Sequence, residues 1–189
     1  MFTIIAAGGD ARRMGRDKAT LPYKGSTMAL TLAKKYEELG PVAFAVNRDR
    51  KFDTGNYPVY EDEFASDGPM NALASAFANT DDDYVFIASL DMPYVEPALI
   101  RRLQEMIGDN DACVIEKANG QVEGFCGVYS HECDFFVDDV IRVGMNTFQR
   151  LLFQINVRYV KPSELPEFDI ERCTRRILTP EDYEAIKND

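Results

Sequence analysis

Short apolar runs alternate with longer amphipathic stretches along most of the chain. The apolar runs predict strands at Thr3–Ala7, Val42–Val46, Tyr57–Tyr60, Tyr84–Ser89, Ala112–Ile115, Val122–Tyr129 and Val157–Val160. The amphipathic stretches predict helices at Met28–Leu39, Met70–Ala78, Glu96–Ile107, His131–Val143, Thr147–Gln154 and Pro180–Ile186. Strands separated by helices of this length are typical of right-handed βαβ units. The pattern therefore predicts a Rossmann-like, doubly wound α/β fold with a mostly parallel sheet, and an antiparallel edge strand at Val122–Tyr129.

Hydroxyl and amide side chains at the expected helix starts sharpen these boundaries. Ser26 or Thr27 is expected to cap the first helix, and Thr179 is expected to cap the last. Asn146 or Thr147 is the expected cap of the helix over 147–154.

Length and composition indicate one globular domain over residues 1–189. At 189 residues the chain is long enough to bury about 70% of its unfolded surface. The formal net charge of −11 disfavours a nucleic-acid binder, which normally carries a basic patch. The negative net charge does not disfavour a small anionic ligand, because a few clustered cations or a metal ion at the binding site can offset the repulsion there.

The four cysteines show no Cys-x-x-Cys spacing and accompany a single histidine, so a zinc site is not expected. Cys113 and Cys126 lie in apolar runs and are interpreted as core residues in a reducing compartment. We find neither a signal peptide nor an apolar run long enough to cross a membrane, so we expect a cytoplasmic protein with no membrane contact.

The stretch after the first predicted strand carries the strongest chemical signal. Gly8 and Gly9 stand at the carboxyl end of that strand, where glycine permits a tight turn and main-chain N–H groups can face an anion. Cationic side chains follow at Arg12, Arg13, Arg16 and Lys18. Free N–H groups and cations in one loop suit a polyphosphate.

The spacing excludes the two commonest phosphate loops. A Walker loop has four residues between its two glycines, and Lys-Ser/Thr follows the second glycine. Here five residues separate Gly9 from Gly15, and Arg16 follows. No Gly-x-Gly-x-x-Gly stands in this stretch either. A dehydrogenase-type Rossmann domain is therefore disfavoured.

Ala7 through Leu21 resembles Leu-Ala-Gly-Gly-x-Ser/Ala-x-Arg-Met-Gly-x-Asp-Lys-x-x-Leu, with Ala6 in place of the leucine. That signature belongs to the molybdenum cofactor guanylyltransferases and their MobA-like nucleotidyltransferase relatives. The resemblance implies a fold like that of the nucleotide-diphospho-sugar transferases. It also implies a nucleotide-binding half over 1–95 and an acceptor-binding half over 96–189.

Asp91 is the expected magnesium ligand. It follows an uncharged strand and would face the phosphate loop from the same edge of the sheet, where a carboxylate could hold Mg²⁺ together with phosphates. A simple turn residue is the alternative. Asp91-Met92-Pro93 resembles the family's Asp-x-Pro, in which the aspartate binds the metal, and this favours the ligand.

The resemblance implies the remaining site residues. Arg13, Lys18 and Asp91 are the expected catalytic residues, with Lys18 on the phosphates. The expected nucleotide-binding set is Ala6, Ala7, Gly8, Gly9, Lys18, Asn47, Asp62, Gly68 and Asp91. Asp62 would accept hydrogen bonds from guanine. Asn47 could instead form an Asx turn, and Asp62 could be an ordinary surface carboxylate.

Two positions depart from the family on the acceptor side. Phe125 and Cys126 stand where relatives carry Pro-Leu, and Leu178 replaces the asparagine of the C-terminal Asn-Thr-Pro-Glu-Asp/Glu. The expected reaction is transfer of GMP from GTP to the terminal phosphate of molybdopterin. A sister enzyme using CTP or another phosphorylated acceptor, and a nucleotide-binding module without catalysis, remain alternatives. A homo-oligomer and transient contact with molybdoenzyme-maturation proteins are left open as partners.

Overall fold

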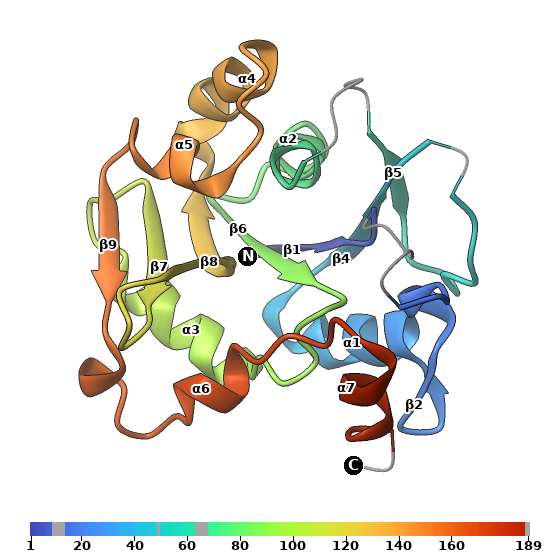
Figure 1. Cartoon of the computed structure of the whole chain (residues 1–189). Coiled ribbons are helices and arrows are strands. Elements are labelled where there is room, and N and C mark those ends of the chain that lie inside the picture. Colours follow the sequence, from blue (N-terminus) through green and yellow to red (C-terminus); the bar gives the residue numbers. More distant parts are fainter. Residues whose placement is uncertain (9–13, 49, 63–67, 188–189) are drawn as a thin grey trace.

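A seven-stranded mixed sheet forms the centre of the protein, in the order β5-β4-β1-β6-β8-β7-β9 (Figure 1). The computed structural model describes residues 1–8, 14–48, 50–62 and 68–187. The strands of this sheet are β1 (Phe2–Ala6), β4 (Val42–Val46), β5 (Val59–Glu61), β6 (Tyr84–Ser89), β7 (Ala112–Glu116), β8 (Val122–Ser130) and β9 (Val157–Val160). Every strand predicted from the apolar runs is present.

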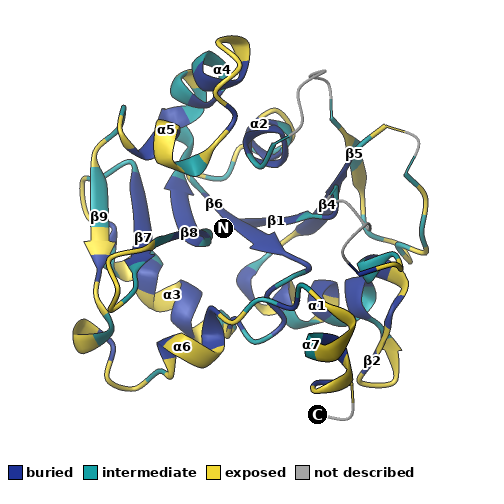
Figure 2. Ribbon diagram, in the orientation of Figure 1, coloured by how far each residue is buried: buried dark blue, intermediate teal, exposed yellow. Residues whose placement is uncertain are grey.

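Helices cover both faces of this sheet, as the alternating pattern predicts (Figure 2). One face packs against α1 (Met28–Tyr36), α3 (Pro97–Met106), α6 (Ile170–Cys173) and α7 (Pro180–Glu184). The other face packs against α2 (Met70–Phe77), α4 (Asp134–Arg142) and α5 (Phe148–Leu152). Alternate residues of the strands supply the two cores: Ile5 and Phe44 lie in the first, and Ile4 and Ala43 lie in the second.

The position of the antiparallel strand differs from the prediction. β8 runs antiparallel, as expected, but it lies inside the sheet and pairs with both β6 and β7. The edges are β5 and β9, where Val59 and Tyr159 are among the exposed large hydrophobic residues. The run from Cys126 to Tyr129 is buried at every position, which suits an interior strand better than an edge.

The predicted helix caps are confirmed. The side chains of Thr27, Thr147 and Thr179 accept hydrogen bonds from the third residue of α1, α5 and α7. The structure adds elements that the pattern does not predict. These include α6 and a hairpin of β2 (Pro22–Tyr23) and β3 (Ser26–Thr27), in which Lys24 and Gly25 both have positive φ. Strands of two residues are too short for periodicity to reveal.

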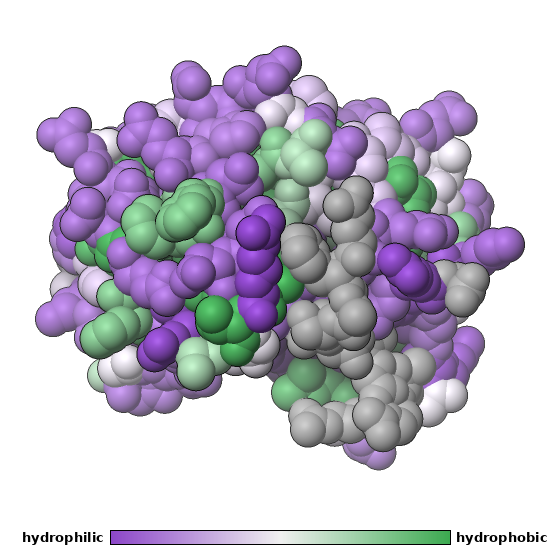
Figure 3. Space-filling model, turned by 90° about the horizontal axis from the view of Figure 1, so that it is seen from above, coloured by the Kyte–Doolittle hydropathy of each residue, from purple (hydrophilic) through white to green (hydrophobic). Residues whose placement is uncertain are grey.

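All four cysteines are buried and form no disulfide, as expected of core residues. Burial raises the pKa of the Cys126 thiol well above its ordinary value. On the face shown in Figure 3, hydrophilic side chains predominate and hydrophobic ones form small separate areas. No helix in the described part of the chain is both long and apolar enough to cross a membrane.

Candidate active site

Three neighbouring parallel strands end at one edge of the sheet and bring the predicted site residues together. Ala6 of β1 pairs with Ala45 of β4 and with Ser89 of β6, so the three strands end in register. The Ala7 N–H continues the ladder by donating to the Ala45 carbonyl at 2.8 Å. Gly8, Asn47 and Asp91 therefore follow adjacent strand ends, the place where α/β sheets bind ligands.

Gly8 lies against the side chain of Asn47. A Cβ at this position would lie 2.0 Å from Oδ1 of Asn47, so any other residue here would require that side chain to move. The φ of Gly8 is not positive, so the close approach of Asn47, and not the backbone conformation, distinguishes this position. The structure thus places Asn47 directly against the start of the predicted phosphate loop.

Lys18 and Asp91 form an ion pair at this edge. Nζ of Lys18 lies 2.5 Å from Oδ1 of Asp91, and the two side chains are 16% and 24% exposed. Both residues are thus in contact with solvent yet fixed in place. The two predicted catalytic groups that the structure describes are in direct contact although 73 positions separate them in the sequence.

Backbone contacts hold both partners of this pair. The Asp91 N–H donates to Oγ of Ser89, and the Asp91 carbonyl accepts from the Ile177 N–H at 2.7 Å. Lys18 begins a 3₁₀ turn that is capped by Asp17, whose Oδ1 accepts from the Ala19 N–H. These bonds do not involve the ammonium or the carboxylate, which contact each other.

Arg50 is a site residue that the sequence reasoning missed. Its Nη2 lies 2.5 Å from Oδ1 of Asp17, so the arginine helps to fix the segment that carries Lys18. No motif marks Arg50, because the pairing depends on how the segment after β4 folds back over the turn.

Asp62 follows β5 at the same edge, where its N–H donates to the Val46 carbonyl at 2.9 Å. Gly9 and Arg13, which the sequence also assigns to the site, lie outside the described residues.

The turn at Gly68 is held by a residue from a distant loop. Oδ1 of Asn146 accepts from the Met70 N–H at 2.8 Å, and Nδ2 of Asn146 donates to Oδ1 of Asn71 at 2.7 Å. A Cβ on Gly68 would lie 2.2 Å from Cγ of Asn146. Asn146 therefore caps α2, whereas the sequence offered it only as an alternative cap for α5.

Replacing Asn146 with alanine is expected to lower the free energy of unfolding by about 1–3 kcal/mol, because its hydrogen bonds to the buried Asn71 amide and to the Met70 N–H are both lost. Urea denaturation followed by circular dichroism measures this change. The matched control is Asn119→Ala, since exposed Asn119 only accepts a local bond from Gln121. We expect the control to stay within about 0.5 kcal/mol of wild type. Equal losses in both variants would contradict the capping role.

A bulge in β8 shapes the opposite side of the site. The pairing with β7 shifts between Val114 and Ile115, and residues 124–126 are left out of the ladder. The Tyr129 hydroxyl donates to the Gly124 carbonyl at 2.9 Å and holds the bulge closed. Burial raises the pKa of Tyr129 well above its ordinary value, so the hydroxyl keeps the proton that it donates.

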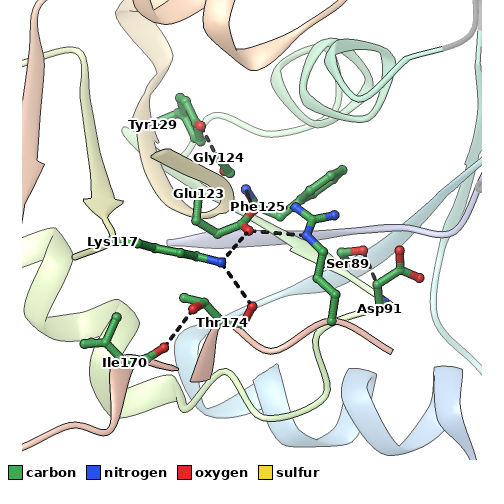
Figure 4. A network of polar contacts seen from close by, with 10 residues as sticks. Ser89, Asp91, Lys117, Glu123, Gly124, Phe125, Tyr129, Ile170 and Thr174 are labelled. Carbon is green, nitrogen blue, oxygen red and sulfur yellow. Dashed lines mark hydrogen bonds and ion pairs between the residues drawn. The ribbon is translucent and has the colours of Figure 1, made fainter. Parts of the chain in front are cut away.

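A buried carboxylate lies beside this bulge and is paired with two cations (Figure 4). The Glu123 side chain is only 4% exposed, and Arg176 donates to both of its oxygens, from Nη2 at 2.6 Å and from Nε at 3.3 Å. Nζ of Lys117 lies 3.6 Å from Oε2 of the same carboxylate. The guanidinium also lies over the Phe125 ring, 5.3 Å from its centroid. Sequence reasoning missed this cluster.

A pocket of about 240 Å³ adjoins the cluster. Its lining includes Pro69, Glu123, Gly124, Thr147, Phe148 and Arg176. Pro69 directly follows Gly68, so the pocket extends from the predicted nucleotide-binding turn to the residues around the bulge.

Comparison with known proteins identifies a family and several relatives of this chain. Residues 3–156 match the MobA-like NTP transferase domain. A probable molybdenum cofactor guanylyltransferase of Carboxydothermus hydrogenoformans is 27% identical over 187 residues, covering 98% of this chain and 94% of that protein. A protein with the same description from Mycobacterium tuberculosis is 30% identical over 155 residues, covering 79% of this chain and 77% of its own.

Solved structures show the same fold. The molybdopterin-guanine dinucleotide biosynthesis protein A of Archaeoglobus fulgidus superposes with a TM-score of 0.86 at 19% identity, covering 100% of this chain and 97% of its own. The 2-C-methyl-D-erythritol 4-phosphate cytidylyltransferase of Thermus thermophilus superposes with a TM-score of 0.70 at 16% identity, covering 98% and 96%. With residues 3–156 matching the domain, this chain belongs to the MobA-like NTP transferase family and is a nucleotidyltransferase.

Proposed function

We propose that this nucleotidyltransferase transfers GMP from GTP to the terminal phosphate of molybdopterin, with release of pyrophosphate. The observation that carries the proposal is the Lys18–Asp91 pair at the edge where β1, β4 and β6 end. A cation for phosphates and a carboxylate for a metal meet there, in a chain that resembles guanylyltransferases along 98% of its length.

The reaction needs positioning more than acid–base chemistry. An oxygen of the acceptor phosphate attacks the α-phosphorus of GTP, and the bond from that phosphorus to the β-phosphate oxygen breaks. The attacking oxygen is already anionic, so no strong base is needed. Lys18, Arg13 and the amides of Gly8 and Gly9 are proposed to bind the pyrophosphate, whose negative charge increases as it departs.

Asp91 is the residue proposed to hold Mg²⁺. The proposal is supported by its carboxylate, which is partly exposed and already pairs with one cation, the Lys18 ammonium. In the described residues no group of three or more acidic, histidine or cysteine side chains could hold a metal ion. A single carboxylate matches the preference of Mg²⁺ for one or two carboxylates plus substrate phosphates and water. When bound, the metal supplies positive charge to the reacting phosphate oxygens.

Asn47, Asp62 and Gly68 are proposed to bind the nucleoside end. All three lie close to the ends of β4, β5 and the turn into α2, within the half that holds the phosphate residues. The Asp62 carboxylate would accept from N1–H and the exocyclic amine of guanine, which offer two donors together. Ala6 and Ala7 would contact the nucleotide through their backbone.

Gly8→Ala is expected to weaken GTP binding by about 2- to 10-fold, because the new methyl group displaces Asn47 and one hydrogen bond to the nucleotide is lost. Isothermal titration calorimetry with GTP and Mg²⁺ measures the change. The double variant Gly8→Ala with Asn47→Ala serves as the control. Since Gly8→Ala acts through Asn47, the double variant should bind about as weakly as Asn47→Ala alone. Fully additive losses would show that Gly8 and Asn47 act independently.

Nucleotide selectivity is the decisive test of the proposed function. Thermal unfolding in the presence of Mg²⁺ and each of GTP, CTP, ATP and UTP should give the largest rise in Tm with GTP. Preference for CTP would redirect the proposal to a cytidylyltransferase. Stabilisation by GTP without pyrophosphate release in the presence of molybdopterin would indicate a binding module.

A further inference from the structure

Arg176 lies where the two halves of the proposed site meet. Its neighbour Ile177 donates a backbone hydrogen bond to Asp91, the proposed metal ligand, at 2.7 Å. Its own side chain lines the pocket that begins at Pro69, next to the turn proposed to bind the nucleotide. Figure 4 shows Phe125, Ser89 and Asp91 on the same side of the polar network. Arg176 therefore lines this pocket and also directly precedes the residue that contacts the backbone of the proposed metal ligand.

The guanidinium is fixed in direction by its two partners. Both oxygens of Glu123 accept from one edge of it, through Nε and Nη2, and the ring of Phe125 packs against its face. A guanidinium has five N–H donors in a rigid plane. The remaining N–H groups donate to no acceptor among the described residues. The side chain is 33% exposed, so these donors can reach a ligand in the pocket.

Glu123 does not depend on Arg176 alone. Lys117 pairs with Oε2, and the Phe125 N–H donates to Oε1 at 3.2 Å. One buried carboxylate thus faces two cations, which leaves this cluster with a net positive charge in a chain whose formal net charge is −11. An arginine held in one orientation, with excess positive charge around it, favours phosphate because it can form charge-assisted bidentate hydrogen bonds to two phosphate oxygens.

We propose that Arg176 binds the phosphate of the acceptor and that Glu123 is the positioning residue that aims it. The ligand class is a phosphomonoester. The pocket, at about 240 Å³, is smaller than the roughly 300–1,000 Å³ of typical ligand sites, so it fits the phosphate and the atoms nearest to it. This inference rests on the proposed function for the acceptor's identity.

A purely structural role is the competing explanation, in which Arg176 only neutralises Glu123. The two roles differ in which kinetic constant changes. Arg176→Met should raise the KM for molybdopterin by about 10- to 100-fold, the effect of losing a charge-assisted bidentate contact, while the KM for GTP changes less than about 2-fold. Arg176→Lys should fall between wild type and Arg176→Met, because a lysine keeps the charge but lacks the planar fork.

Arg175→Met is the matched control. Arg175 is exposed and lies one residue away, and its replacement changes the net charge by the same amount. The KM values of this variant should therefore stay at the wild-type level. Circular dichroism and Tm are recorded for all variants to exclude misfolding. Equal KM values for molybdopterin in Arg176→Met and Arg175→Met, or a parallel rise of the KM for GTP in Arg176→Met, would overturn the inference.

Binding of inorganic phosphate separates this inference from the proposed function. It is measured by titration in the presence of a saturating non-hydrolysable GTP analogue and Mg²⁺, which occupies the nucleotide phosphate subsites. Wild type and Arg175→Met should bind phosphate at least about 10-fold more tightly than Arg176→Met. If wild type fails to use molybdopterin but still shows this difference, the acceptor is another phosphomonoester and Arg176 keeps its role. If phosphate binds all three proteins equally, the role of Arg176 is wrong whatever the acceptor.

Discussion

Replacing Asp91 with asparagine is expected to lower kcat by about 10²- to 10³-fold while the protein stays folded. Asparagine has the same shape but no charge, so the proposed metal loses its protein carboxylate at the reacting phosphates; preorganised charges of this kind have effects of about that size. The fold should persist because the carboxylate is partly exposed and asparagine keeps its shape and an oxygen that can accept a hydrogen bond from Lys18. The bond that the Asp91 N–H donates to Oγ of Ser89, and the one that the Asp91 carbonyl accepts from the Ile177 N–H, are unchanged by the substitution.

Pyrophosphate release with GTP, Mg²⁺ and molybdopterin measures this loss, and urea denaturation checks stability. Asp53→Asn is the matched control, because Asp53 is exposed, makes only a local bond to the Gly55 N–H and undergoes the same change of charge. The control should keep wild-type activity. Near-full turnover by Asp91→Asn would remove Asp91 from the mechanism.

Replacing Lys18 with methionine is expected to change two affinities in opposite directions. GTP with Mg²⁺ should bind about 10- to 100-fold more weakly, since a charge-assisted contact to the phosphates is lost. A divalent metal without nucleotide should bind more tightly than to wild type, because the ammonium that lies 2.5 Å from Asp91 no longer competes for its carboxylate. On the proposed mechanism, we therefore expect metal binding to be tighter when a nucleotide's phosphates are present to compete with Asp91 for Lys18.

Calorimetry with GTP and Mg²⁺ tests the first affinity, and electron paramagnetic resonance of Mn²⁺ without nucleotide tests the second. Lys24→Met is the matched control, because Lys24 is an exposed lysine in the nearby hairpin whose ammonium lies over the Tyr23 ring. It should reproduce both wild-type affinities. Unchanged nucleotide binding by Lys18→Met would refute the phosphate role, and unchanged Mn²⁺ binding would refute the competition at Asp91.

The sequence was sufficient for most of the fold because its information is local. β4, β6 and β9 have the predicted boundaries, and the predicted threonines cap α1, α5 and α7. Apolar runs and cap residues act on their own neighbours in the chain, so a linear reading detects them. The loop signature at Ala7–Leu21 is equally local, and it pointed to the family that residues 3–156 match.

The sequence by itself determined most strands and helices and the phosphate-loop signature, and it was enough to select Lys18 and Asp91 as candidate site residues. Only the tertiary structure decided that β8 lies inside the sheet, that Asn146 caps α2, and that Arg176 pairs with Glu123 across 53 positions. It also decided that Lys18 touches Asp91. The physical reason is that hydrophobic periodicity encodes burial and secondary structure for each segment, whereas strand order and side-chain pairing depend on how distant segments pack against one another.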